Sequence, residues 1–277
     1  MNQDERFLIA IDLDDTILSE LFSLSAESVW ALRDAQEAGH IVMIATARPW
    51  CITEPYYLAL GLNSLVSVMN GSYMYHPKDT SAPTFRHDID AATTRIVLDA
   101  MQDNGVEHIF LEANDDLYTA DQVYPGHPYW KLLADHSIKH VMDPLPAVAC
   151  ARIYGKAPNG AAAEAVRERI AAGGNLRVHV GEAPDGTCHI HVWSIKANKW
   201  YTVQEAAEYY GIRPENIMTF GDERIDDLMT RHAAHGYVMC NGNREMVEEA
   251  IAEGRGVTKH PCADGGVGYE IRRILGI

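Results

Sequence analysis

The first chemistry-bearing residues in the chain are two aspartates spaced two apart, Asp12 and Asp14, directly after the apolar run of residues 7–11. If the extended geometry of that run continues, both carboxylates project to the same side. At about 4 Å two such charges repel by about 4 kcal/mol at an effective dielectric near 20, so the pair needs a cation or a shifted pKa. Oxygen-only ligands favour Mg²⁺. A solvated acidic loop with Thr16 as a helix N-cap is the alternative.

Two later apolar runs end in the same kind of residue. Residues 217–220 lead into Gly221 and Asp222, with Asp226 four positions on, and residues 40–45 lead into Thr46. Read alone, Thr46 fits an N-cap beside a proline-started helix better than it fits a functional role. Because the carboxyl ends of parallel strands share one edge of a sheet, we expect these groups near Asp12.

A lysine completes the candidate set. Lys199 opens a predicted helix over residues 199–210 that stops at Gly211, so its ammonium joins the positive end of the helix dipole, where an anion binds. Lys196, three residues earlier, is expected to be a linker charge.

Alternating strands and helices must position these residues. Ser25 can cap a helix that stops at Gly39, and a third strand over residues 65–69 meets the turn Asn70-Gly71 and returns over residues 73–75. Strands at residues 217–220, 236–239 and 256–258 alternate with helices near the end of the chain. This order predicts an α/β fold with a parallel sheet.

The pattern changes over residues 78–193. A helix followed by two strands occurs twice there, which predicts an α+β module of two such halves sharing one antiparallel sheet. We therefore expect a core domain of residues 1–77 and 194–277, with residues 78–193 inserted as a cap that sets substrate specificity.

The amino-acid composition limits the classes of molecule that this protein is expected to bind. The 277 residues carry a formal net charge of -16, which repels nucleic acid and anionic lipid and favours small molecules. The five cysteines form no CxxC pair, and no apolar run reaches about 18 residues, so we expect a cytoplasmic location, with no disulfide framework and no membrane span. The sequence does not decide between a monomer and a homodimer.

Taken together, these motifs resemble the haloacid dehalogenase (HAD) superfamily, specifically Cof-type phosphatases with a large C2-type α+β cap. The resemblance spans nearly the whole chain and depends on four motifs in order. They are Asp12, Asp14 and Thr16; Thr46; Lys199; and Gly221, Asp222, Asp226 and Met229. Two positions depart from the family pattern: Ile225 replaces a usual asparagine, and Trp200 replaces a usual glycine.

The resemblance implies a Rossmann-like parallel-sheet core and an Mg²⁺-dependent phosphatase for small phosphorylated metabolites, sugar phosphates first. Asp12 would be the nucleophile that forms an aspartyl phosphate, and Asp14 the general acid and base. Thr46 and Lys199 would bind the phosphoryl group, and Asn241 would contact phosphate or metal or serve only as a turn residue. The implied magnesium ligands are Asp12, the Asp14 backbone carbonyl and Asp222, and Asp226, also counted with the metal site, would orient either Lys199 or a metal-bound water without binding the ion directly.

Two other functions stay open on the same residues. A phosphotransferase or mutase would use Asp12 but pass the phosphoryl group to a hydroxyl. A non-catalytic binding protein on this scaffold is favoured only by Ile225.

Overall fold

The computed structural model describes residues 6–19, 23–120, 133, 135–171 and 174–277. The chain forms two compact units. The first unit comprises Met1–Ala47, Glu54–Phe85 and Asn198–Ile277, and the second comprises Arg48–Thr53 and Arg86–Ala197. The predicted boundaries at residues 77 and 193 lie close to, but not at, the limits of these units. The assignment of residues 78–193 as a cap stays a prediction.

A five-stranded parallel sheet forms the centre of the first unit, in the order β14-β13-β12-β1-β2. The α/β prediction is confirmed. β1 lies between β12 and β2, with Leu8 opposite both Ile217 and Ile41. All four residues of β1 are fully buried, which explains why the run is apolar without alternation. The strands are β1 (Leu8–Ile11), β2 (Ile41–Ile44), β12 (Ile217–Gly221), β13 (His235–Val238) and β14 (Gly256–Val257).

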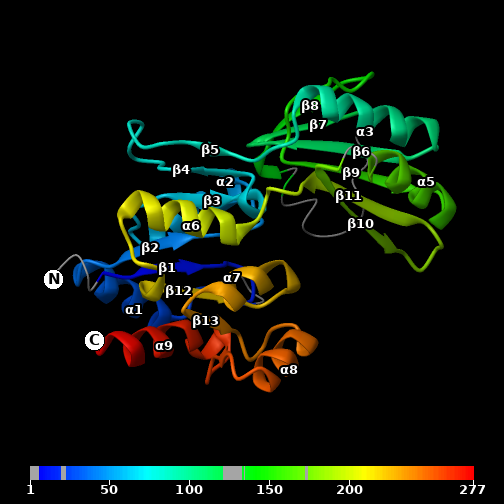
Figure 1. Ribbon diagram of the computed structural model, residues 1–277. Coiled ribbons are helices and arrows are strands. Elements are labelled where there is room, and N and C mark those ends of the chain that lie inside the picture. The colour runs from blue at the N-terminus through cyan, green and yellow to red at the C-terminus, as the bar shows by residue number, and fades with distance from the viewer. Residues whose placement is uncertain (1–5, 20–22, 121–132, 134, 172–173) are drawn as a thin grey trace. The chain divides into compact units, whose positions relative to one another are not determined.

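Helices cover both faces of this sheet (Figure 1). On one face lie α1 (Ala26–Glu37) and α9 (Gly266–Leu275), which pack against each other. On the other face α6 (Lys199–Tyr210) packs its buried Val203 and Ala206 against Leu8 and Ala10 of β1. Three further helices among the described residues are α2 (Trp50–Ala59), whose first residues belong to the second unit, α7 (Asp227–His232) and α8 (Arg244–Ala252).

The ends of α6 follow from local chemistry. The Asn198 side chain accepts a hydrogen bond from Trp200 N and caps the start of the helix, and Gly211 ends it in the left-handed conformation at φ 66°. The predicted helix over residues 199–210 is confirmed. Ser25 likewise caps α1 through Ser28 N.

The third predicted strand does not extend the parallel sheet. β3 (Val66–Val68) pairs with β4 (Tyr73–Tyr75) in a separate three-stranded sheet that also contains β5 (Phe85–Arg86). Its link to β2 is a single bridge between Ala45 and Ser67. The hairpin prediction is right, and the bridge is parallel, as the predicted strand order requires, but β3 is three residues long and pairs mainly with the returning strand, so it is not one of the five strands of the parallel sheet.

The second unit contains a six-stranded sheet in the order β10-β11-β9-β6-β7-β8. Helices α3 (Ala91–Asp103) and α5 (Gly160–Ala171) pack together on one face of it (Figure 1). The strands are β6 (Glu107–Ala113), β7 (Asp116–Thr119), β8 (Ile138–Val141), β9 (Arg152–Ala157), β10 (Leu176–Glu182) and β11 (Cys188–Ser194). Two helix-strand-strand halves are present, but the sheet is not wholly antiparallel, because β8 pairs parallel with β7.

Candidate active site

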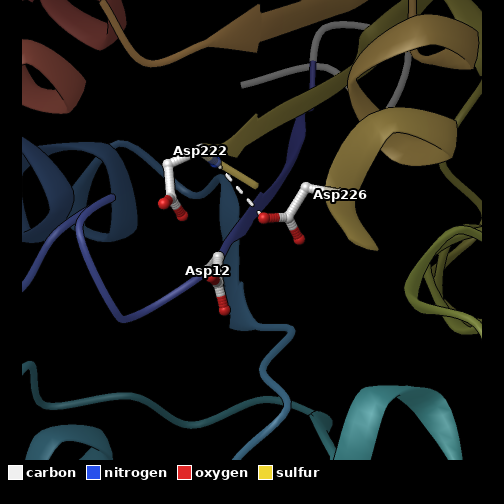
Figure 2. Close-up of side chains that lie close together, drawn as sticks. All are labelled: Asp12, Asp222 and Asp226. Atoms are coloured by element: carbon white, nitrogen blue, oxygen red, sulfur yellow. Dashed lines mark hydrogen bonds between the residues drawn. The ribbon is translucent and has the colours of Figure 1, made fainter. Parts of the chain in front are cut away.

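Three carboxylates converge at the carboxyl ends of two neighbouring strands (Figure 2). Asp12 follows β1, and Asp222 and Asp226 follow β12. One oxygen from each lies within 4.8 Å of the others. The parallel pairing of β1 with β12 brings together residues more than 200 positions apart in the chain, as the sequence predicts.

The chain turns sharply after β1. Asp12 N donates to Phe220 O at 3.1 Å, and Leu18 N then closes a loop onto Leu13 O at 2.8 Å, with Asp15 in the left-handed conformation at φ 48°. β1 ends at Ile11, so strand alternation does not carry through to Asp14. Asp12 is buried and Asp14 is exposed. The two carboxylates therefore occupy different environments, and the Asp14 carboxylate is not part of the three-acid group.

Thr16 has a role that the sequence analysis missed. Its hydroxyl donates to Asp222 Oδ1 at 3.1 Å, and the residue is fully buried. The first described helix begins at Ala26, so the N-cap alternative for Thr16 is wrong. The spacing of Thr16 from Asp12 and Asp14 indicated that Thr16 belongs to the site. Only the fold shows that its hydroxyl orients the Asp222 carboxylate.

Lys199 lies between two of the acids. Its Nζ is 2.8 Å from Asp12 Oδ1 and 2.6 Å from Asp226 Oδ1, and its side chain is 1% exposed. Burial lowers the pKa of Lys199, but the charges of Asp12 and Asp226 outweigh it and raise that pKa overall. The two carboxylates therefore favour the protonated ammonium of Lys199. Lys196, by contrast, is exposed.

Asp226 has both oxygens occupied. Oδ1 accepts from Lys199, and Oδ2 accepts from the backbone N–H of Asp222 at 3.2 Å and of Glu223 at 3.3 Å. A side chain at Gly221 would bring a Cβ to 2.3 Å from Asp226 Cβ, so glycine is required there. These contacts are those of a residue that orients Lys199 and the loop after β12.

The negative charge of the group exceeds its positive charge. Burial, opposed by Lys199 and assisted by Asp226, raises the pKa of Asp12 to about 7. Burial and the charges of Asp12 and Asp226 raise the pKa of Asp222 to about 8. One ammonium thus faces three carboxylates. A hard divalent cation with oxygen ligands fits this site, because it would offset both the burial and the repulsion that raise the two pKa values.

Thr46 lies just beyond β2 and is fully buried. Its N–H donates to Ser67 O and its carbonyl accepts from Asn70 N, both at 2.9 Å. The backbone of Thr46 is therefore fixed by β3 and by the turn that follows it, η2 (Met69–Gly71).

The same turn supports the start of α6. Ser67 Oγ lies 2.8 Å from Thr202 Oγ1, and Thr202 Oγ1 donates to Lys199 O at 2.8 Å. Gly71, at φ 84°, approaches so closely that an added Cβ would lie 2.5 Å from Asn198 O. The β3 hairpin thus contacts both Thr46 and the residues that carry Lys199.

Asn241 has both ends of its amide engaged. Nδ2 donates to Asp15 O and Oδ1 accepts from Cys262 N, each at 2.8 Å. The side chain therefore joins the loop after β1 to the segment before α9. Contact with phosphate or metal stays a prediction for this residue.

The two departures from the family pattern lie beside the site without displacing its charges. Ile225, in the short helix η4 (Arg224–Asp226), is 37% exposed. Trp200 is half-buried with its ring 5.9 Å from that of His232. The contacts of Lys199 and Asp226 form with both residues present.

Similarity to known proteins identifies the family. A model of the haloacid dehalogenase-like hydrolases matches residues 9–271. The chain belongs to this family. This chain is 25% identical over 246 residues to the 5-amino-6-(5-phospho-D-ribitylamino)uracil phosphatase YitU of Bacillus subtilis. The match covers 85% of this chain and 87% of that protein.

Two further matches extend over most of the chain. The phosphoglycolate phosphatase of Methanothermobacter thermautotrophicus is 25% identical over 257 residues, covering 91% of this chain and 95% of that one. A haloacid dehalogenase-like hydrolase from Bacteroides thetaiotaomicron superposes with a TM-score of 0.75 at 17% identity, covering 97% and 99%. The predicted enzyme class, a HAD-like phosphatase, is confirmed. Among the described residues no helix has the length and apolar character needed to cross a bilayer.

Proposed function

We propose that this HAD-like hydrolase is an Mg²⁺-dependent phosphatase of small phosphorylated metabolites and that it acts through an aspartyl phosphate on Asp12. The observation that carries the proposal is the position of Lys199, buried between Asp12 and Asp226 with Asp222 adjacent. That arrangement holds a carboxylate nucleophile beside an ammonium group, and attack on an anionic phosphoryl group requires both.

In the first step an Asp12 carboxylate oxygen bonds to phosphorus, and the bond between phosphorus and the ester oxygen breaks. The leaving alkoxide takes a proton from Asp14, whose exposed carboxyl can exchange protons with water. In the second step water attacks phosphorus, Asp14 accepts its proton, and Asp12 is released with inorganic phosphate. Lys199 and Thr46 bind the phosphoryl oxygens throughout.

Magnesium fits the three-acid group, and Asp12, Asp222 and the Asp14 backbone carbonyl would hold it, with Asp226 nearby. When bound, it supplies the positive charge that lets the anionic ester approach three carboxylates. Thr16 fixes the orientation of Asp222 for that task through its hydroxyl.

The substrate is a phosphomonoester of a small metabolite. The relatives named above act on a phosphorylated ribitylaminouracil and on phosphoglycolate, and the first of these carries its phosphate on a sugar-derived chain. We propose sugar phosphates and related polyol phosphates as the first class to assay. The second unit would act as the specificity cap.

Release of inorganic phosphate from p-nitrophenyl phosphate tests the reaction. Wild-type protein should turn over in the presence of MgCl₂, and Asp12→Asn should abolish turnover while the fold survives, because the amide is nearly isosteric but cannot attack phosphorus. Phosphate release by Asp12→Asn at the wild-type rate would contradict the proposal, as would a phosphoryl adduct trapped on another residue. Formation of a new phosphoester on an added alcohol, in place of phosphate release, would indicate the phosphotransferase instead.

A further inference from the structure

Three consecutive residues after β3 have left-handed backbone conformations. Met69, Asn70 and Gly71 have φ values of 51°, 57° and 84°. Only the last is a glycine, and this region is unfavourable for residues that carry a Cβ. Non-glycine residues held in such conformations cluster at binding and catalytic sites, so the turn is a candidate for a functional role.

The turn lies beside both residues proposed to bind the phosphoryl group. β3 is bridged to β2 in parallel, so the two strands end at the same edge. Asn70 N donates to Thr46 O at 2.9 Å. Gly71 packs against the backbone of Asn198, and Lys199 is the next residue. All of these residues belong to the first unit, and Asn70 therefore lies next to its phosphoryl-binding edge.

The fold does not use the side-chain amide of Asn70. An asparagine in this conformation can hydrogen-bond to backbone nearby, but Asn70 Oδ1 is buried and has no partner among the described residues. Nδ2 has no partner there either, and it is not buried. The oxygen end of the amide is thus enclosed in protein, and the nitrogen end presents N–H donors. An amide left unbonded in this way needs an explanation.

The phosphoryl site is short of such donors. A phosphoryl group in transfer carries negative charge on three equatorial oxygens. Lys199 has three N–H donors, and two of them are directed at Asp12 and Asp226. One N–H of Lys199 is left for the three oxygens, and the carboxylates nearby are themselves negative. A neutral N–H donor at this edge would stabilise the phosphoryl oxygens.

We propose that Asn70 is a further substrate-binding residue and that its Nδ2 donates to an oxygen of the phosphoryl group, alongside Lys199 and Thr46. The inference rests on the proposed phosphatase function. Its ligand is the phosphate dianion that all phosphomonoesters share, so the contribution of Asn70 should not depend on the alcohol part of the substrate.

Two substitutions separate the amide from the backbone of the turn. Asn70→Gly keeps the left-handed conformation, which glycine adopts readily, and removes the amide. Asn70→Asp keeps the shape of the side chain and replaces the N–H donors with a negatively charged acceptor. A role confined to the shape of the turn predicts that aspartate is tolerated, whereas the proposed contact predicts that it is the worse of the two.

Two control variants match these changes. Asn114→Gly alters an exposed asparagine at nearly the same φ, 58°, in the turn between β6 and β7. Ser72→Ala removes a hydroxyl next to the left-handed turn that is likewise buried without a partner in the described part of the chain. The first control reports on a left-handed asparagine away from the site, and the second on a disturbance of the same turn.

Inorganic phosphate is the binding probe, because it has no alcohol part. Calorimetric titration in saturating MgCl₂ gives its Kd, and steady-state kinetics on p-nitrophenyl phosphate and β-glycerol phosphate gives kcat/KM. Asn70→Gly should weaken phosphate binding by about tenfold, the loss of one hydrogen bond to a charged group, and should lower kcat/KM at least as much on both esters. Asn70→Asp should lose more, because its carboxylate repels phosphate. Both controls should keep wild-type values, and Asn70→Gly should melt close to Asn114→Gly.

Wild-type phosphate affinity in Asn70→Gly or in Asn70→Asp would overturn the inference. Equal losses in Ser72→Ala and Asn70→Gly would do the same, because the effect would then belong to the turn and not to the amide. A loss confined to one ester would place Asn70 against the alcohol part and contradict the proposed contact. Absence of wild-type turnover of p-nitrophenyl phosphate would instead refute the phosphatase function, and the phosphate titration would still test Asn70.

Discussion

At the scale of single residues, the site depends on where one ammonium is placed. Lys199 Nζ contacts Asp12 and Asp226 within 2.8 Å, while Lys196, three positions earlier, is exposed. The sequence pattern favours Lys199 over Lys196, and the structure buries Lys199 but not Lys196. Their different burial leads to different kinetic expectations.

Lys199→Met should lower kcat by roughly a thousandfold, because a buried ammonium and a phosphoryl oxygen at about 4 Å attract by about 4 kcal/mol at an effective dielectric near 20. Lys196→Met should stay within about tenfold, as expected for an exposed charge. Steady-state kinetics on p-nitrophenyl phosphate with saturating MgCl₂ measures both. A reversed order of the two phenotypes would remove Lys199 from the phosphoryl-binding role.

The role of Asp14 as the general acid can be tested by comparing two leaving groups. In the first turnover, Asp14→Asn should slow release of an alkyl alcohol such as glycerol by about a hundredfold, because a poor leaving group needs a proton. Release of p-nitrophenol in the same phase should fall much less, since that leaving group needs little protonation. Rapid-quench measurements on β-glycerol phosphate and p-nitrophenyl phosphate compare the two. Equal losses would argue against Asp14 as the acid.

At the scale of elements, the β3 hairpin positions both phosphoryl-binding residues. It fixes the backbone of Thr46 through Ser67 and Asn70, and it abuts Asn198 through Gly71. Lys199 is the next residue. A change in this turn should therefore reach the site without altering any charge.

Gly71→Ala tests this arrangement against Gly61→Ala. Both glycines have positive φ, 84° and 66°, so both substitutions carry a backbone cost of about 1–2 kcal/mol. Only Gly71 has a neighbour, Asn198 O, at 2.5 Å from an added Cβ, whereas Gly61 has none within 4 Å.

Both variants should melt at lower temperature, and Gly71→Ala alone should lose at least about tenfold in kcat/KM, because small misplacements of catalytic groups are costly. Similar kcat/KM values for the two variants would show that the turn does not set the position of Lys199.

At the scale of the whole molecule, the three-acid group should lower stability in the absence of metal. The raised pKa values of Asp12 and Asp222 mean that the folded state favours their protonated forms, so ionising them at pH 8 destabilises the fold. A ligand that binds only the folded state has the opposite effect.

Asp222→Asn should therefore raise the melting temperature in EDTA at pH 8, since it removes one of three repelling charges while the amide oxygen can still accept from Thr16. MgCl₂ should stabilise wild-type protein and have little effect on this variant, which should also need far more Mg²⁺ for turnover. Calorimetry with and without MgCl₂, together with activity titrations, provides both readouts. Full wild-type activity in EDTA, or equal stabilisation of both proteins by MgCl₂, would contradict the metal assignment.

Much of the first unit could be predicted from local sequence. The buried run of β1, the capped helix α6 and its stop at Gly211 each depend on residues next to one another in the chain. The motif order therefore identified the family and the carboxyl-end site. Such signals are readable because capping, helix propensity and burial of a short strand are local properties.

Other features depended on which segments lie side by side. Thr16 orients Asp222 across 206 positions, and Asn241 joins the loop at Asp15 to Cys262. The ion pair of Arg152 with Glu112 forms between β9 and β6, which are not consecutive in the chain, and the parallel pairing of β8 with β7 departs from the predicted antiparallel sheet. Local sequence patterns thus predict the elements and the chemical groups at their ends. The partner of each polar side chain depends on the fold, because a hydrogen bond depends on distance in space and a local pattern does not encode it.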